Sequence, residues 1–252
     1  MRSQQRRALL LGALRTGEVD VAGLARHFGV SASTVRRDLQ HLSAEKAVRR
    51  TYGGAILTTQ GPESTLSERE TVQDKQKRAI ALAALAMIED GETLILDAGS
   101  TVMALGCLLK GRRLTIVTNN VALLPALANE PNIEMIVLGG SLRATSMGTV
   151  GHFAMEALRR ITADRVFMSA DGVVAGRGLC EASLDQVWLK SLMMEQARET
   201  IVLADATKLG RSEQSAWAPL PPRWRLVTDA EATSPEMLAL IAAGAEAITV
   251  TP

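Results

Sequence analysis

From residue 93 to the C-terminal end, short apolar runs alternate with segments long enough to form helices. The runs are nearly continuous in Val, Ile and Leu, which is typical of parallel strands that helices cover on both faces. We therefore expect an α/β domain built on a parallel sheet. The predicted strands are residues 93–96, 114–118, 135–138, 165–169, 200–203, 225–228 and 247–250. A helix is predicted before them, from about residue 67 to residue 88, with Lys75, Lys77 and Arg78 on its polar side.

Polar residues follow five of these predicted strands. Because the carboxyl ends of parallel strands meet at one edge of a sheet, these residues should converge where α/β proteins bind ligands. Glycine and hydroxyl groups at a helix start suit phosphate, carboxylates and amides suit sugar hydroxyls, and Arg or Lys suits an anion. The candidate residues are Asp97, Gly99, Ser100, Thr101, Asn119, Gly139, Gly140, Arg143, Asp171, Asp205 and Lys208. A single Asp or Gly at a strand end is more often a turn residue. Five converging ends make a polar, anionic ligand an equally strong interpretation.

The sequence indicates no cofactor and no metal. No G-x-G-x-x-G pattern follows a strand, so a dinucleotide site is disfavoured. His27, His41 and His152 lie far apart, without the spacing of metal ligands. Cys107 and Cys180 are also far apart, which argues against a disulfide framework and favours a reducing cytoplasm.

The first 58 residues have the pattern of a winged helix-turn-helix. A first helix is expected from a cap at Ser3 to about Gly17, and a second over residues 21–28. Gly29 then suits a tight turn, because glycine accepts positive φ without a steric penalty. A third helix should start at Ser31 or Ser33 and run to about residue 44. Gly-Gly at 53–54 lies between two β-prone runs and predicts a hairpin, the wing.

The polar residues of the third helix crowd its N-terminal half, which enters the major groove in this motif. Arginine can pair with guanine there, hydroxyl groups can reach phosphates or base edges, and arginines on the wing can contact the DNA backbone. The predicted DNA-binding residues are Ser31, Ser33, Thr34, Arg36, Arg37, Gln40, Arg49 and Arg50. The alternative is a three-helix interaction module whose arginines are merely solvated.

Charge divides the chain in the same way. The net charge of +1 is the sum of +6 for residues 1–60, from 10 basic and 4 acidic residues, and −5 for the remainder, from 18 and 23. A basic head on an acidic body suggests that only the head meets a polyanion. Aromatic residues make up only 3% of the chain, which disfavours a protein that stacks on single-stranded nucleic acid.

The run VAGLARHFGVSASTVRRDLQHLSAEKAVRRTYGGA, residues 21–55, resembles the DNA-binding head of DeoR-type bacterial repressors. That family reads V-x-x-L-A-x-x-F-x-V-S-x-x-T-[VI]-R-R-D-L, then an arginine, then G-G-A. The resemblance implies double-stranded operator DNA as a partner. A single head reads only half of a two-part operator, so the chain should form at least a dimer. The family resemblance adds a tetramer as a second option.

The body resembles the C-terminal sensor domain of the same family, which is similar in fold to ribose-5-phosphate isomerase and glucosamine-6-phosphate deaminase. The matching residues are Arg69, Lys77, Ile80, Ala81, DAGST at 97–101, TNN at 118–120, LGG at 138–140, ADG at 170–172, Glu181, Lys190 and LADATKLG at 203–210. The resemblance adds Glu181 and Lys190 to the effector-binding residues. It implies that a small phosphorylated sugar or sugar acid binds this edge and changes DNA affinity.

The predicted fold class is therefore two domains: a small α+β winged helix-turn-helix, and an α/β parallel-sheet sensor of the sugar-phosphate isomerase-like fold. The predicted boundaries are 1–58 for the head, 59–66 for a linker and 67–252 for the sensor. The predicted function is a transcriptional regulator, most simply a repressor of a sugar or sugar-acid catabolic operon. Release from the operator by the effector is the predicted mechanism.

The alternative function is an isomerase or deaminase fused to a DNA-binding head. Asp97, Asp171, Glu181 and Lys190 offer suitable residue types for proton transfer. However, the isomerase's D-G-A-D-E cluster is reduced to Asp171-Gly172-Val173-Val174, and its K-G-G-G-G loop is absent from the sequence. We therefore expect a sensor without enzymatic activity.

No membrane association is expected. Arg2, Arg6 and Arg7 precede an apolar run at residues 8–14, but this run lacks a small-residue cleavage site and is better explained as an amphipathic helix. The next apolar stretch, residues 80–88, is far too short to span a bilayer.

Overall fold

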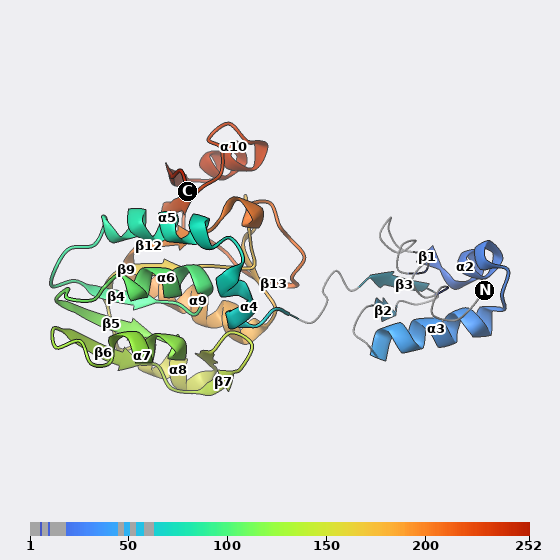
Figure 1. Ribbon diagram of the computed structural model, residues 1–252, viewed down its shortest axis with the longest axis horizontal. Coiled ribbons are helices and arrows are strands. Elements are labelled where there is room, and N and C mark those ends of the chain that lie inside the picture. The colour runs from blue at the N-terminus through green and yellow to red at the C-terminus, as the bar shows by residue number, and fades with distance from the viewer. Residues whose placement is uncertain (1–5, 7–9, 11–18, 45–47, 51–53, 58–62) are drawn as a thin grey trace. The chain divides into compact units, whose positions relative to one another are not determined.

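The computed structural model describes residues 6, 10, 19–44, 48–50, 54–57 and 63–252. The chain divides into two compact units, Met1–Glu63 and Ser64–Pro252 (Figure 1). The division falls inside the segment 59–66 that the sequence suggests as a linker.

Two helices form the helix-turn-helix of the first unit. Helix α2 spans Val21–Phe28 and α3 spans Ala32–Ala44, as predicted. Gly29 ends α2 with a φ of +62°, in the left-handed region that favours glycine. The predicted first helix lies outside the described residues except for positions 6 and 10, which are both helical.

Apolar residues from these helices share one small core. Its fully or nearly fully buried members are Leu10, Val21, Leu24, Val35 and Leu39. A buried ion pair accompanies the core, with Arg6 Nε donating to Asp38 Oδ2 at 2.5 Å. This pair joins Arg6 to α3 and was not predicted.

The wing is an antiparallel hairpin, as predicted. Strand β2 (Val48–Arg50) pairs with β3 (Gly54–Leu57), so that Val48 lies opposite Leu57 and Arg50 opposite Ala55. Of the predicted Gly-Gly turn, Gly53 lies outside the described residues and Gly54 begins β3. A short strand that was not predicted, β1 (Val19–Asp20), pairs with the other side of β3.

The second unit is built on a seven-stranded, entirely parallel sheet in the order β15-β14-β12-β9-β4-β5-β6. This confirms the predicted parallel α/β class. The strands are β4 (Thr93–Leu96), β5 (Leu114–Thr118), β6 (Ile133–Val137), β9 (Ala163–Met168), β12 (Ala197–Leu203), β14 (Trp224–Thr228) and β15 (Ala245–Thr249).

Five of the seven strands begin one to three residues before their predicted starts. In four of these strands the added residues include charged ones, namely Glu134, Asp164, Arg198 with Glu199, and Glu246, whereas β14 adds only Trp224. Charged side chains also pair along the amino edge of the sheet. Arg165 Nε donates to Glu199 Oε2 at 2.7 Å, and Arg225 Nη1 lies 2.9 Å from Glu199 Oε1. A strand start rich in charges has no apolar signal, which explains the late predicted boundaries of those four strands.

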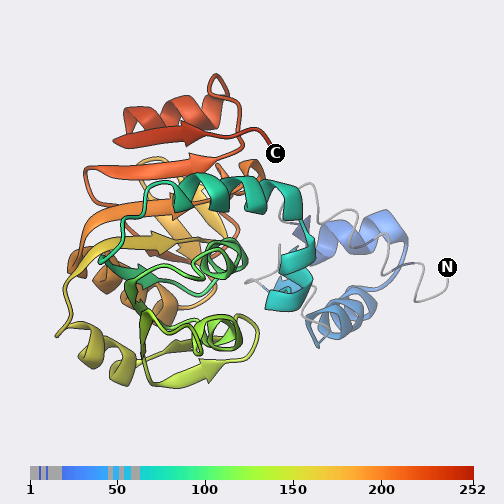
Figure 2. The ribbon, with the colours of Figure 1, turned by 60° about the vertical axis from the view of Figure 1, so that its left-hand side comes forward.

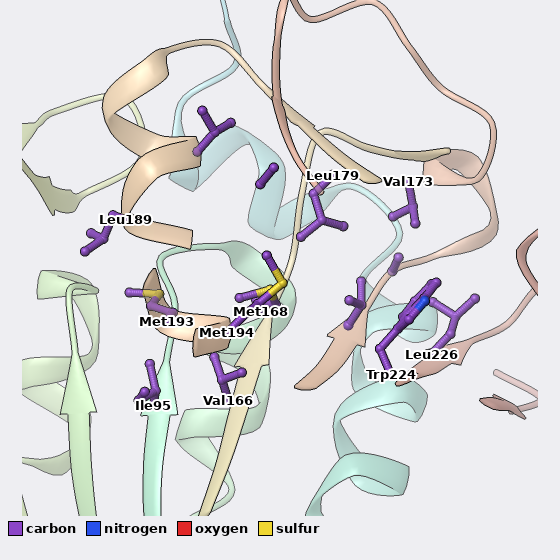
Figure 3. Close-up of a cluster of buried hydrophobic side chains, with 14 of the residues drawn as sticks. Ile95, Val166, Met168, Val173, Leu179, Leu189, Met193, Met194, Trp224 and Leu226 are labelled. Atoms are coloured by element: carbon purple, nitrogen blue, oxygen red, sulfur yellow. The ribbon is translucent and has the colours of Figure 1, made fainter. Parts of the chain in front are cut away.

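Helices cover both faces of the sheet (Figures 1 and 2). On one face lie α5 (Asp74–Leu85), α6 (Ser100–Cys107), the 3-10 turn η1 (Val121–Leu123) and α7 (Leu124–Leu127). On the other lie α8 (His152–Leu158), α9 (Leu184–Gln196) and α10 (Pro235–Ala242). Figure 3 shows the core of this second face, where Met193 and Met194 of α9 lie near Ile95, Val166 and Met168 of the sheet.

Two small β structures at the carboxyl edge were not predicted. One is the hairpin of β7 (Ser141–Arg143) and β8 (Gly148–Val150). The other is an antiparallel sheet of β10 (Gly172–Val174), β11 (Gly178–Glu181) and β13 (Ala216–Ala218). Their strands of three or four residues are too short to show a clear period.

The single helix predicted over residues 67–88 is wrong. The structure has two helices, α4 (Leu66–Thr71) and α5, separated at Gln73, whose φ of +56° is left-handed. Lys77, expected on a polar face, is instead buried, and its Nζ donates to the backbone oxygens of Arg69 and Val72. The lysine thus satisfies carbonyl groups that a continuous helix would have bonded internally.

Within the described residues, no helix combines the length and the apolar character needed to cross a membrane.

Candidate functional site

The exposed face of α3 presents the predicted DNA-binding residues of that helix. Ser33, Arg36, Arg37 and Gln40 are exposed, and their spacing of i, i+3, i+4 and i+7 places them on one side. The opposite side, which includes Val35, is buried in the core. Side chains on this free face can reach the edges of bases in a major groove.

Ser31 and Thr34 also have a local role. Ser31 Oγ accepts a hydrogen bond from the backbone N–H of Thr34 at 3.2 Å, the contact of a helix N-cap. The same oxygen lies 2.8 Å from the hydroxyl oxygens of Ser33 and Thr34. This network fixes the start of the helix. Arg49 and Arg50 belong to β2, and their side chains lie outside the described part of the structure.

In the second unit, the carboxyl ends of β4 and β5 and helix α9 meet at a small cavity. Its volume of about 10 Å³ has room for about one water molecule. The cavity is lined by Asp97, Ala98, Asn119, Ser146, Gly148, Val150, Gln186 and Lys190. Of the predicted effector residues, Asp97, Asn119 and Lys190 therefore face a common space.

A buried ion cluster forms the floor of this cavity. Lys190 Nζ donates to Asp97 Oδ2 and to the backbone oxygen of Ser169, and it lies 3.1 Å from Glu181 Oε1. The three charged side chains are each 6% exposed or less. An ammonium group has three donors, and three oxygens surround this one. Lys190 therefore neutralises the carboxylates, and we do not expect it to bind a ligand directly.

Burial and charge shift the pKa values of this cluster. Burial raises the pKa of Glu181 to about 7, although the positive charge of Lys190 opposes the shift. Burial alone would lower the pKa of Lys190, but Asp97 and Glu181 outweigh it and hold that pKa above its usual value. Lys190 therefore stays charged at neutral pH, whereas Glu181 titrates near it.

Asp171 lies beside this cluster at the end of β9. Its Oδ2 accepts a hydrogen bond from Gln214 Nε2 at 2.7 Å, and its Oδ1 lies 3.8 Å from Arg69 Nη1. The negative charge of Asp171 also contributes to the raised pKa of Glu181. Asp171 thus joins the cavity floor to a second group of charges.

That second group contains Lys77, Asp205, Lys208 and Arg69. Burial lowers the pKa of Lys77, and among the neighbouring charges Asp205 raises it while Lys208 and Arg69 lower it further. Asp205 also caps the 3-10 turn η2 (Ala206–Lys208) by accepting from the backbone N–H of Thr207 at 3.0 Å. Asp205 and Lys208, which follow β12, therefore interact electrostatically with Lys77 of α5.

The start of α6 lies between β4 and β9. Gly99 lets the chain pass close to Ser169, since a Cβ atom at this position would lie 2.0 Å from Ser169 Oγ and would displace that hydroxyl group. Ser100 and Thr101 form the first turn of α6, whose free backbone N–H groups favour an anion. The structure therefore supplies the helix start that the sequence suggested for phosphate.

Gly139, Gly140 and Arg143 do not line the cavity. Both glycines are exposed, and Gly140 has a φ of +118° in the turn toward β7, so the turn interpretation fits them better. Ser146 and Gly148 of the β7–β8 hairpin lie there instead. A Cβ atom on Gly148 would lie 2.6 Å from Ala98 Cβ, so the glycine permits the close approach of this hairpin.

Sequence reasoning left other site residues out of the predicted set. Ser146, Gln186 and Gln214 gave no signal, although Gln186 precedes Lys190 by one helical turn and donates to Glu181 Oε2 at 3.1 Å. Arg69 and Lys77 entered only through the family resemblance. Among the described residues, no group of three or more His, Cys, Asp or Glu side chains could hold a metal ion.

An exposed, basic helix-turn-helix joined to an α/β unit with a buried polar site defines a class: transcription regulators with a sensor domain. Comparison with known proteins gives the family. The model of the DeoR C terminal sensor domain matches residues 72–230, and that of the DeoR-like helix-turn-helix domain matches residues 6–61. The chain belongs to the DeoR family of transcription regulators.

Several relatives are similar along most of the chain. An uncharacterized HTH-type transcriptional regulator of Bacillus subtilis is 34% identical, covering 84% of this chain and 82% of the relative. A putative aga operon transcriptional repressor of Escherichia coli O157:H7 is 30% identical, covering 83% and 80%. The glycerol-3-phosphate regulon repressor of Escherichia coli K12 is 30% identical, covering 78% of each. These relatives are regulators and not enzymes, in agreement with the predicted absence of catalysis.

Among solved structures, ribose 5-phosphate isomerase A from Methanocaldococcus jannaschii has a TM-score of 0.40 at 17% identity, covering 54% of each chain. A probable sor operon regulator from Shigella flexneri has a TM-score of 0.39 at 13% identity, covering 57% of this chain and 80% of the other. The family assignment rests on the sequence matches alone.

Proposed function

We propose that this protein represses an operon for sugar or sugar-acid catabolism and leaves its operator when a phosphorylated sugar-type metabolite binds. The observation that carries the proposal is the convergence of Asp97, Asn119 and the start of α6 at one edge of the sheet. The names of the relatives support it, since one is a repressor of the glycerol-3-phosphate regulon and another a putative repressor of the aga operon.

The effector's phosphate would bind the first turn of α6, and its hydroxyl groups would bind the cavity floor. Asn119 Oδ1 is buried and has no hydrogen-bond partner among the described residues, so it can accept a hydrogen bond from a ligand. Asp97 is an acceptor beside it. Hydroxyl groups of a sugar supply such donors.

Binding of this ligand requires the cavity to widen. A space for about one water cannot hold a sugar phosphate, so the wall formed by the β7–β8 hairpin has to move. A ligand that prefers the wider arrangement shifts the protein toward it. Release follows if that arrangement has the lower affinity for operator DNA.

On the DNA side, Ser33, Arg36, Arg37 and Gln40 would read or contact the major groove, with Ser31 and Thr34 at the helix start. Arg49 and Arg50 of the wing would contact the backbone. Two heads are needed for a two-part operator, so we propose at least a dimer. An operator partner also favours the cytoplasm as the place of action.

The test begins by selecting operator sequences from random duplex DNA with the full-length chain. Fluorescence anisotropy then measures release by ribose 5-phosphate, glucose 6-phosphate, glycerol 3-phosphate and other phosphorylated sugars. We expect at least one to release wild-type protein, and Lys208→Ala and Asp97→Asn to bind DNA normally but resist release.

Lys110→Ala is the matched control for Lys208→Ala, because Lys110 is an exposed lysine of the same unit. It should respond like the wild type. Isomerisation of any of these compounds by the protein, or loss of DNA binding in the Lys208 variant alone, would count against a sensor role for this edge.

A further inference from the structure

Arg69 of α4 has an unusual hydrogen-bonding state. Its Nη1 lies 3.8 Å from Asp171 Oδ1, but its Nε and Nη2 are buried and have no hydrogen-bond partner among the described residues. Buried donors without a partner are rare in folded proteins, and each such group requires an explanation.

The two unpaired nitrogens lie on the same edge of the guanidinium group. This edge presents two parallel N–H groups, the geometry that binds two oxygens of a carboxylate or phosphate at once. A neutral hydroxyl group would satisfy only one of them. The chemistry of the edge therefore selects an oxyanion.

Charges of both signs lie near Arg69. Besides burial, the pKa of Lys77 responds to the positive charges of Lys208 and Arg69 and to the negative charges of Asp205 and Asp74. Lys77 Nζ already donates to the backbone oxygens of Arg69 and Val72 and is buried, so its donors are largely occupied. An incoming oxyanion would therefore find its free donors on Arg69.

Helix α4, which carries Arg69, is mostly exposed. Among its own residues only Leu66 is buried. The N–H of Leu66 donates to the backbone oxygen of Thr145 at 2.8 Å, in the turn of the β7–β8 hairpin that also supplies the cavity wall. At its other end the chain passes through the left-handed Gln73. In sequence, α4 is also the first helix after the boundary between the two units.

We propose that Arg69 is an oxyanion anchor of the effector site, and that α4 transmits the binding toward the DNA-binding unit. The proposal rests on the proposed function and adds Arg69 to the first turn of α6, so that both hold the same oxyanion of the effector. Both unpaired nitrogens are buried although the side chain of Arg69 is 21% exposed, so an oxyanion reaches them only when α4, this side chain or its covering shifts. Binding to Arg69 is thereby coupled to movement of the helix that continues into the linker.

The first experiment uses inorganic phosphate as the probe on the full-length chain, with chloride at equal ionic strength as the reference. Phosphate should raise the melting temperature of the wild type, and it should slow amide hydrogen exchange in residues 64–73. Arg69→Met should lose both effects. Arg78→Met, which removes an exposed arginine from neighbouring α5, should keep both.

Arg69→Lys distinguishes the contribution of the two parallel N–H groups from that of the positive charge, because lysine keeps the charge but lacks the paired N–H groups. We expect its affinity for phosphate to fall on the order of tenfold. An equal phosphate response in the wild type and in Arg69→Met, or no response in either, overturns the anchor. If phosphate raises the melting temperature of the wild type but not of Arg69→Met, and yet leaves amide exchange in residues 64–73 of the wild type unchanged, the role of α4 is overturned.

Two further probes identify the source of the oxyanion. Gluconate offers a carboxylate without phosphate, and ribose 5-phosphate offers phosphate on a sugar. The probe that stabilises the wild type but not Arg69→Met carries the oxyanion, carboxylate or phosphate, that Arg69 binds. If Arg69 binds phosphate but no phosphorylated compound releases DNA, the anchor stands and the proposed function fails. If release occurs and survives in Arg69→Met, the function stands and the anchor fails.

Discussion

Polar side chains gather both on helix α3, the recognition helix, and at the carboxyl edge of the parallel sheet, but they are exposed on the helix and buried at the sheet edge. On α3, Arg36, Arg37 and Gln40 are exposed and free to meet a large external partner. At the sheet edge, Asp97, Glu181 and Lys190 are at most 5% exposed and compensate one another. Exposed charges contribute little to stability, whereas a buried charge destabilises strongly once its partner is removed. Mutations should therefore change DNA affinity in the first region and folding stability in the second.

The largest effect is expected from Lys190→Met. Removing the ammonium group leaves Asp97 and Glu181 buried side by side without a cation, which should cost about 3–5 kcal/mol of unfolding free energy. Urea unfolding followed by tryptophan fluorescence measures it, because all three tryptophans lie in the second unit. Lys110→Met, at an exposed site, should change the value by less than about 0.5 kcal/mol. Equal losses in the two variants would show that the cluster is not a buried network.

Glu181 gives this region a pH dependence that the recognition helix should lack. Its pKa is about 7 in the folded chain and near 4.5 when unfolded, so the folded state holds the proton more tightly. The associated stability is fully present below about pH 4.5 and is lost as pH rises through 7, a decrease of up to about 3 kcal/mol. The unfolding free energy measured from pH 5 to 8 should thus fall in the wild type relative to Glu181→Gln. Parallel curves for both proteins would refute the raised pKa.

Arg37→Ala tests the exposed region. If Arg37 contacts a base edge, its loss should cost about 1–3 kcal/mol at one operator position and relax specificity there, with folding stability unchanged. Anisotropy titrations against a set of single-base operator variants measure the difference. A uniform loss across all variants would place Arg37 on the phosphate backbone instead.

The smallest effect is expected from Arg50→Ala on the wing. A phosphate contact by Arg50 predicts that the slope of log K against log salt concentration becomes shallower by about one unit. Binding measured between 50 and 200 mM salt is sufficient. A slope equal to that of the wild type would remove Arg50 from the interface.

The contrast between the two regions also explains what could be predicted from sequence. The bounds of α2, and of β4 and β5 in the sheet, follow from local apolar patterns, and their predictions are confirmed. The polar face of α3 follows from the same periodicity, because exposure on a helix repeats every three to four residues.

The buried region depends on contacts between distant segments. The break at Gln73 requires Lys77 to bond the carbonyl groups of α4, and no local pattern announces such a contact. Glu181 and Lys190 became candidates through resemblance, since nothing in their spacing from Asp97 indicates an ion cluster. The β7–β8 hairpin supplies Ser146 and Gly148, but of its residues only Arg143 entered the predicted effector site.

The central claim is that effector binding at the sheet edge and operator binding by the first unit oppose each other. Thermodynamic linkage makes this measurable from the ligand's side. Isothermal titration calorimetry of a releasing sugar phosphate, with and without saturating operator, gives two dissociation constants. We predict a weaker constant with operator, by the same factor by which the ligand lowers DNA affinity. Equal constants in the two titrations would contradict the account.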